Sequence, residues 1–219
     1  MSQLPTIFSH DSPGFHLAKT WQIGPQAEID PVVWAAHYLQ ALRDLAVRAD
    51  WITLGDGATP PTAALIGIGQ YVHAINRQLD RILQHFLDCF EIAQQPQVQV
   101  FAAPIMAKAG IDGFCNFQHH PITLMVDPSR ILTADWPHLV AHELAHGIAR
   151  TDGHGPRFKQ ALDHLCLAHD LPLAPGNSLE TNVLPYWPPC RQNPSRDRFW
   201  LELSYLGPLD MNRPTVADT

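Results

Sequence analysis

The sequence predicts an α+β protein. Two long helical patterns come first, three short strand-like segments follow, and further helical patterns come after them. With 219 residues, the chain is long enough to bury one substantial core. We expect an irregular arm over residues 1–28, a main domain over 29–175, and a Pro-rich extension over 176–219 that packs on this domain.

Both N-terminal helical patterns are predicted to serve as scaffold. Asp30 can cap the first helix and Pro31 suits its first turn, after which apolar residues recur at helical spacing to about Ala49. The second pattern runs from about Ala63 to Ala93 and carries a broad apolar stripe. Neither pattern contains a motif that indicates chemistry.

Three short strands are predicted between these helices and the next one. In QVQV, Val98 and Val100 alternate with glutamines, which is the period of a strand. A second strand is expected around FCNF, and a third, PITLMV, ends in an Asp-Pro turn. Near the C-terminus, FWLELSYL over Phe199 to Leu206 also resembles a strand.

The charge and the N-terminal sequence exclude several classes of protein. A net charge of -7 and a pI near 5.9 argue against nucleic acid as a partner. The first 21 residues lack the basic and apolar regions of a secretory signal, and no stretch approaches the roughly 20 apolar residues of a membrane span. The four cysteines form no CxxC pair. We therefore expect a cytoplasmic protein with reduced thiols, and the sequence does not indicate its oligomeric state.

The segment HELAHGIARTDGHGPRF, residues 142–158, is typical of a zinc site. It is predicted to lie on a helix capped by Asp135 or Thr133. His142 and His146 are one turn apart, and with Glu143 they fall within an arc of about 100° on the helix. Two imidazoles at this spacing can bind one ion, while the glutamate can reach a water molecule beside it. A histidine-rich helix without metal is the alternative interpretation.

Zinc needs a third protein ligand if its fourth position is to hold water. His154 is the preferred candidate, because Gly153 is suited to end the helix in a left-handed conformation and to turn the chain back. Asp152, Glu180 and Glu202 remain alternatives at this stage.

These residues resemble the SprT-like zinc metalloproteases, the family that includes Spartan. His142, Glu143 and His146 match its HExxH element, and the run from His154 to Phe158 looks like its third-ligand segment. The order of strand, turn and helix before the motif is also similar, so that the resemblance covers about residues 97–170. It implies a small zincin-like core in which a short, mostly antiparallel sheet packs on the HExxH helix, with an edge strand able to hold an extended substrate.

We therefore expect a zinc metallopeptidase that uses one Zn²⁺ ion and acts on a protein or peptide. Glu143 would be the general base of this hydrolase, and ITLMV would bind the substrate if it lies at a sheet edge. A zinc-binding interaction module without turnover and a DNA-associated protease are the alternatives, although the acidic charge and the lack of a CxxC ribbon argue against the second. Candidates for the oxyanion donor are Tyr186, Tyr205, His138 and Arg157.

Overall fold

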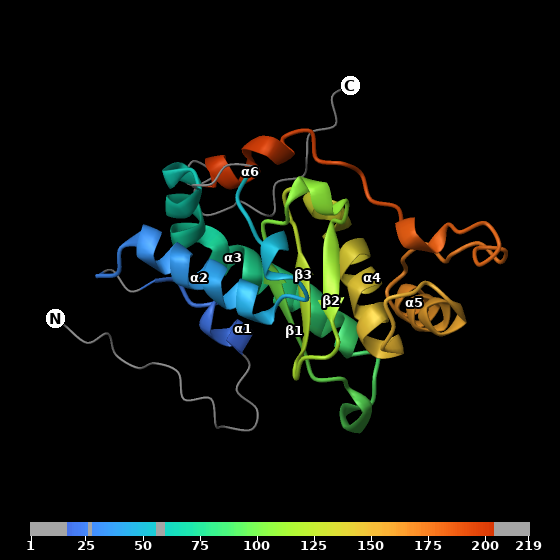
Figure 1. Cartoon of the computed structure of the whole chain (residues 1–219). Coiled ribbons are helices and arrows are strands. Elements are labelled where there is room, and N and C mark those ends of the chain that lie inside the picture. The colour runs from blue at the N-terminus through green and yellow to red at the C-terminus, as the bar shows by residue number, and fades with distance from the viewer. Residues whose placement is uncertain (1–16, 26–27, 56–59, 204–219) are drawn as a thin grey trace.

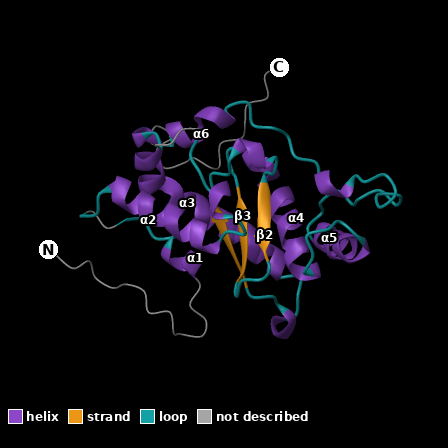
Figure 2. Cartoon of the chain, in the orientation of Figure 1, coloured by secondary structure: helices purple, strands orange, loops and turns teal. Residues whose placement is uncertain are grey.

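The computed structural model describes residues 17–25, 28–55 and 60–203 (Figure 1). This part of the chain is α+β, with six α-helices and one three-stranded sheet (Figure 2). The helices are α1 (Leu17–Thr20), α2 (Pro31–Leu45), α3 (Thr62–Leu87), α4 (Trp136–Ala149), α5 (Pro156–Ala168) and α6 (Arg196–Glu202). The strands are β1 (Val98–Ala102), β2 (Gly113–Asn116) and β3 (Ile122–Val126).

The sheet has the order β1-β3-β2 and is mixed. β1 runs parallel to β3, with Val98 opposite Ile122, whereas β2 runs antiparallel to β3, with Gly113 opposite Val126. The expectation of a mostly antiparallel sheet is therefore wrong. ITLMV is the central strand and not an edge strand, because it pairs with β1 on one side and with β2 on the other. All five of its residues are buried. β2 is an outer strand instead.

The scaffold helix α3 and the HExxH helix contact different strands of the sheet. α2 packs on α3, α3 lies against β1, and α4 lies against β2 and β3 (Figure 1). Most of the apolar stripe of α3 between Ile68 and Phe86 is fully buried, and Ile82 is partly buried. At the end of β1, the buried Asn76 of α3 accepts hydrogen bonds from the backbone N–H of Ala102 at 2.9 Å and from the Tyr38 hydroxyl at 3.2 Å. This polar contact joins two helices to the sheet without leaving an unpaired group.

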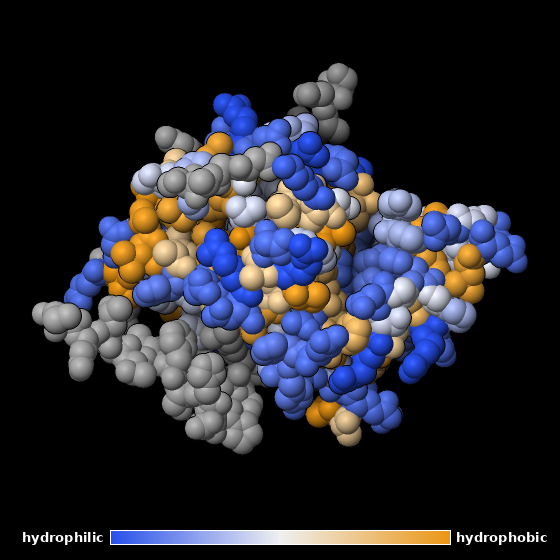
Figure 3. All heavy atoms as spheres, viewed as in Figure 1, coloured by the Kyte–Doolittle hydropathy of each residue, from blue (hydrophilic) through white to orange (hydrophobic). Residues whose placement is uncertain are grey.

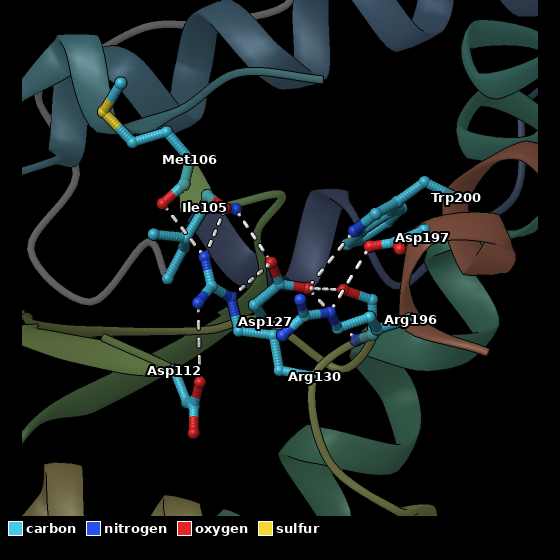
Figure 4. Close-up of polar contacts among 9 residues, drawn as sticks. Ile105, Met106, Asp112, Asp127, Arg130, Arg196, Asp197 and Trp200 are labelled. Atoms are coloured by element: carbon cyan, nitrogen blue, oxygen red, sulfur yellow. Dashed lines mark hydrogen bonds and ion pairs between the residues drawn. The ribbon is translucent and has the colours of Figure 1, made fainter. Parts of the chain in front are cut away.

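The predicted strand FWLELSYL is wrong, because Arg196–Glu202 forms α6; residues 204–206 lie outside the described residues. Trp200 and Leu203 are both buried, and their spacing of three residues is helical. The Trp200 indole donates a hydrogen bond to Oδ1 of Asp127, which directly follows β3 (Figure 4). The contact with Asp127 and packing against α3 hold α6 on the domain.

Asp127 is a buried carboxylate at the end of β3. Besides Trp200, it accepts hydrogen bonds from the backbone N–H groups of Ile105 and Ser129 and from Nε of Arg130 (Figure 4). Burial raises the pKa of Asp127, and these donors oppose that shift. Asp127 thus fixes the first part of the turn that leads from β3 to α4.

The described surface mixes hydrophilic and apolar residues in the view of Figure 3. Within the described ranges, no helix combines the length and the apolar character needed to cross a bilayer.

Candidate metal centre

The structure brings His142, His146 and His154 together. One potential ligand atom from each histidine lies within 4.8 Å of the others. Asp152, Glu180 and Glu202, the alternatives for the third ligand, do not belong to this group. The three side chains are close enough to bind one metal ion.

His154 reaches this position through a different turn from the one the sequence predicts. α4 ends at Ala149, and Arg150 adopts the left-handed conformation, with φ at 49°. The prediction that Gly153 would take this role is wrong. The left-handed residue at the helix end lets the chain reverse, as expected. Gly153 instead donates its N–H to Oγ1 of Thr151 at 3.1 Å, a contact that closes the short loop before His154.

Backbone carbonyl groups fix the orientation of two imidazoles. Nδ1 of His142 lies 2.8 Å from the carbonyl oxygen of Trp187, and Nδ1 of His146 lies 2.7 Å from that of Thr151. A carbonyl oxygen only accepts hydrogen bonds, so both Nδ1 atoms must carry the proton. Each Nε2 atom is then left with a free lone pair, which is the form that binds a metal.

One pair of ring nitrogens has the separation expected for two ligands of a tetrahedral metal ion. Nε2 of His142 and Nε2 of His154 are 3.2 Å apart. Two nitrogens bound tetrahedrally at zinc–nitrogen distances of 2.0–2.1 Å would be separated by about 3.3 Å. The ring of the buried Phe158 packs against all three imidazoles, with centroid distances of 5.0, 4.4 and 4.7 Å. Phe158 therefore limits the movement of the rings.

The imidazoles are neutral near pH 7. Burial, together with a smaller effect of the neighbouring imidazoles, lowers the pKa of His142 to about 3 and that of His154 to about 4. The pKa of His146 is also lowered, chiefly by burial. Since a metal binds the neutral imidazole, protons compete weakly with a metal in the folded protein.

Glu143 lies on the same helix and is only 5% exposed. Burial raises the pKa of its carboxyl to about 8, and the negative charge of Asp112 adds to this effect. Asp112 is paired with Arg130 at 3.6 Å (Figure 4). The carboxyl also approaches β2 closely, since a Cβ atom added to Gly113 would lie 2.9 Å from Oε1 of Glu143. The HExxH glutamate therefore lies directly beside the start of the outer strand.

A Gly113→Ala substitution is expected to lower the free energy of unfolding by about 1–3 kcal/mol, because the added methyl group overpacks a filled space. The Cβ atom of the new alanine would lie 3.0 Å from the carbonyl oxygen of Met125 and also against Glu143. Either β2 or the Glu143 side chain must therefore shift. Gly176→Ala is the matched control, since its added Cβ meets nothing within 4 Å. Denaturant unfolding measures both variants. Equal stability of the two would show that β2 does not approach Glu143 this closely.

For the metal-free protein, Glu143→Gln is expected to become more stabilising as the pH rises from 5.5 to 8. The pKa of Glu143 is raised from 4.5 to about 8, so its contribution to stability is fully present below pH 4.5 and is lost as the pH rises through 8. Glutamine does not titrate, and the difference between variant and wild type should grow by about 3 kcal/mol over this range. Denaturant unfolding with a chelator present measures it. A constant difference would contradict the raised pKa.

Three of the four candidates for the oxyanion donor lie in the described residues. His138 is engaged with the carbonyl oxygen of Pro189 at 2.8 Å, and Arg157 lines a separate cavity with Cys89. The Tyr186 side chain is 78% exposed, and Tyr205 lies outside the described residues.

Sequence reasoning missed the contribution of the C-terminal extension. The carbonyl group of Trp187 leaves no signal in the sequence, because every residue has one. Asp135 was expected to cap α4, but its side chain makes no capping hydrogen bond. It accepts hydrogen bonds from Arg191 instead, at 2.7 Å from the backbone N–H, 2.9 Å from Nε and 2.7 Å from Nη2. These contacts lower the pKa of Asp135.

Comparisons with protein-family models, with curated proteins and with solved structures found no match for this chain. Any statement about its activity therefore depends on the geometry of the site.

Proposed function

We propose that this protein is a zinc-dependent metallopeptidase with a zincin-like core. The observation that carries the proposal is the combination of three imidazoles around one point with a glutamate on the helix that holds two of them. A purely structural site has no need for Glu143 next to the first ligand. The three neutral histidines, two of them oriented by backbone carbonyls and all three packed against Phe158, form a donor set typical of a catalytic zinc site, in which three protein ligands leave one position free.

In this proposal His142, His146 and His154 hold the ion. When bound, zinc would lower the pKa of a water molecule and polarise the carbonyl group of the scissile peptide. Glu143 accepts the proton of the attacking water through its carboxylate and then donates it to the nitrogen of the leaving amine. Its raised pKa in the metal-free protein shows that the environment favours the protonated form, which suits the second of these steps.

The outer strand β2 is the proposed place for the substrate. It begins at Gly113, beside Glu143, and it pairs with β3 on one side only. An extended peptide added along its other side would make backbone hydrogen bonds and would pass the carboxyl of Glu143. Recognition by backbone groups gives modest side-chain selectivity, so an unfolded protein is the expected class of substrate.

A metal-binding interaction module without turnover is the second candidate. The low exposure of Glu143 and His146, 5% and 8%, favours it, because a substrate needs access to both the ion and the base. Incubation of the zinc-loaded protein with an unfolded protein such as casein distinguishes the two candidates. Cleavage that a chelator abolishes supports the peptidase, whereas tight zinc binding without any cleavage supports the module.

A further inference from the structure

The segment from Trp187 to Asn193, which we call the strap, runs along the HExxH helix and the turn before it. Its direction is opposite to that of the chain over residues 130–142. The N–H of Asn193 donates to the carbonyl of Arg130 at 2.8 Å, and the carbonyl of Arg191 accepts from the N–H of Leu132 at 3.0 Å. A β-bridge between Ile131 and Gln192 lies between these two contacts.

The contacts continue from there to a metal ligand. Pro189 presents its carbonyl oxygen to Nδ1 of His138 at 2.8 Å. Two residues earlier in the chain and one helical turn later on α4, Trp187 presents its carbonyl oxygen to Nδ1 of His142, also at 2.8 Å. Trp187, the first residue of the strap, therefore contacts the imidazole of His142, one of the three proposed metal ligands.

The strap is anchored at its first residue and near its middle. At its first residue, the Trp187 indole donates a hydrogen bond to the carbonyl of Pro172 at 2.8 Å. Trp187 is thus held by its side chain as well as by its backbone contact with His142. In the middle, Arg191 and Asp135 form a latch of three hydrogen bonds on a carboxylate that is 6% exposed. A buried carboxylate that accepts a bidentate guanidinium and a backbone N–H gives a geometrically specific contact.

From these contacts we infer that the strap is part of the metal centre, and that Arg191 and Asp135 are positioning residues for His142. The latch holds residues 187–191 against α4, and the strap in turn fixes the tautomer and orientation of the His142 ring. This inference rests on the metal binding of the proposed function, although it does not depend on catalysis. Because the strap favours the metal-binding form of His142, a bound metal must favour the docked strap to the same extent.

The test is a zinc affinity measured by competition with a chelating dye. The partner of His142 is a backbone carbonyl, which no side-chain substitution removes. The substitutions are therefore made in the latch, at Arg191 and Asp135. Arg191→Ala and Asp135→Asn are each expected to weaken zinc binding about 3- to 10-fold, less than the 10- to 100-fold typical when the direct partner of a ligand is lost. Arg191→Lys keeps the charge but loses the bidentate contact, and should fall between wild type and Arg191→Ala.

Arg198→Ala is the matched control. Arg198 lies in the same extension and pairs with Glu202 on the surface of α6, away from the strap. Its zinc affinity should stay within about twofold of wild type, because a surface pair of this kind contributes little. Affinities of Arg191→Ala and Asp135→Asn that equal that of Arg198→Ala would overturn the inference. A wild type that binds no zinc would instead overturn the proposed function.

A second measurement needs no variant and separates positioning from a merely structural contact. Amide hydrogen exchange of the wild type is compared with and without zinc. Zinc should slow exchange at the N–H groups of Leu132, Arg191 and Asn193, which donate the hydrogen bonds of the strap. If zinc slows exchange in the loop of Thr151 but leaves these three amides unchanged, the strap is not coupled to the metal and the inference is wrong.

Discussion

Replacing His154 by alanine is expected to weaken zinc binding by more than about 100-fold, beyond the range caused by loss of a partner hydrogen bond. Two ligands on α4 would remain, and a site with two imidazoles no longer satisfies zinc. His154 is partly exposed, and the loop that carries it is held by contacts of Thr151, so the substitution should leave the fold intact. Competition with a chelating dye measures the affinity, and circular dichroism checks the fold.

Asp152→Ala is the control for this prediction. Asp152 is two residues from His154 in the same loop, and the sequence alone left it as an alternative ligand, but the structure does not group it with the histidines. We expect one zinc per chain with unchanged affinity. Retention of full affinity by His154→Ala, together with its loss in Asp152→Ala, would show that the third ligand has been misidentified.

Glu143→Gln should keep the zinc affinity and lose nearly all peptide cleavage, by about 10²- to 10⁴-fold. Glutamine has the same shape as glutamate but accepts no proton, and it replaces a carboxyl whose pKa is already raised by burial. The fold should be preserved or stabilised. Zinc content by elemental analysis and cleavage of casein are measured on the same preparation. Cleavage by the variant at the wild-type rate would exclude Glu143 as the base.

The local part of the site could be predicted from the sequence. The three histidines and Glu143 lie within 13 consecutive residues, 142–154, so that helical spacing and one reversal of the chain suffice to bring them together. The exact turn was less predictable. Arg150 and not Gly153 takes the left-handed conformation, so that α4 ends directly before a residue that the sequence does not mark as a helix end.

The non-local parts could not be predicted. The parallel pairing of β1 with β3 joins residues 24 positions apart, and nothing in QVQV or ITLMV specifies the direction of pairing. The contact between His142 and Trp187 spans 45 residues and uses a carbonyl group, which has no signature in the sequence. The strand prediction for FWLELSYL was wrong because alternating and helical patterns are hard to distinguish in so short a run. The burial of both Trp200 and Leu203, three residues apart, is consistent with the helix.

The most direct test of the metal-dependent activity is reconstitution of the metal-free protein with measured amounts of zinc, followed by cleavage of casein. We expect no cleavage without metal and a rate that rises in proportion to added zinc up to one equivalent per chain, since one group of three histidines is found in the described part of the chain. Cleavage that persists in excess chelator, or no cleavage at any zinc concentration although one equivalent binds, would contradict the proposed peptidase.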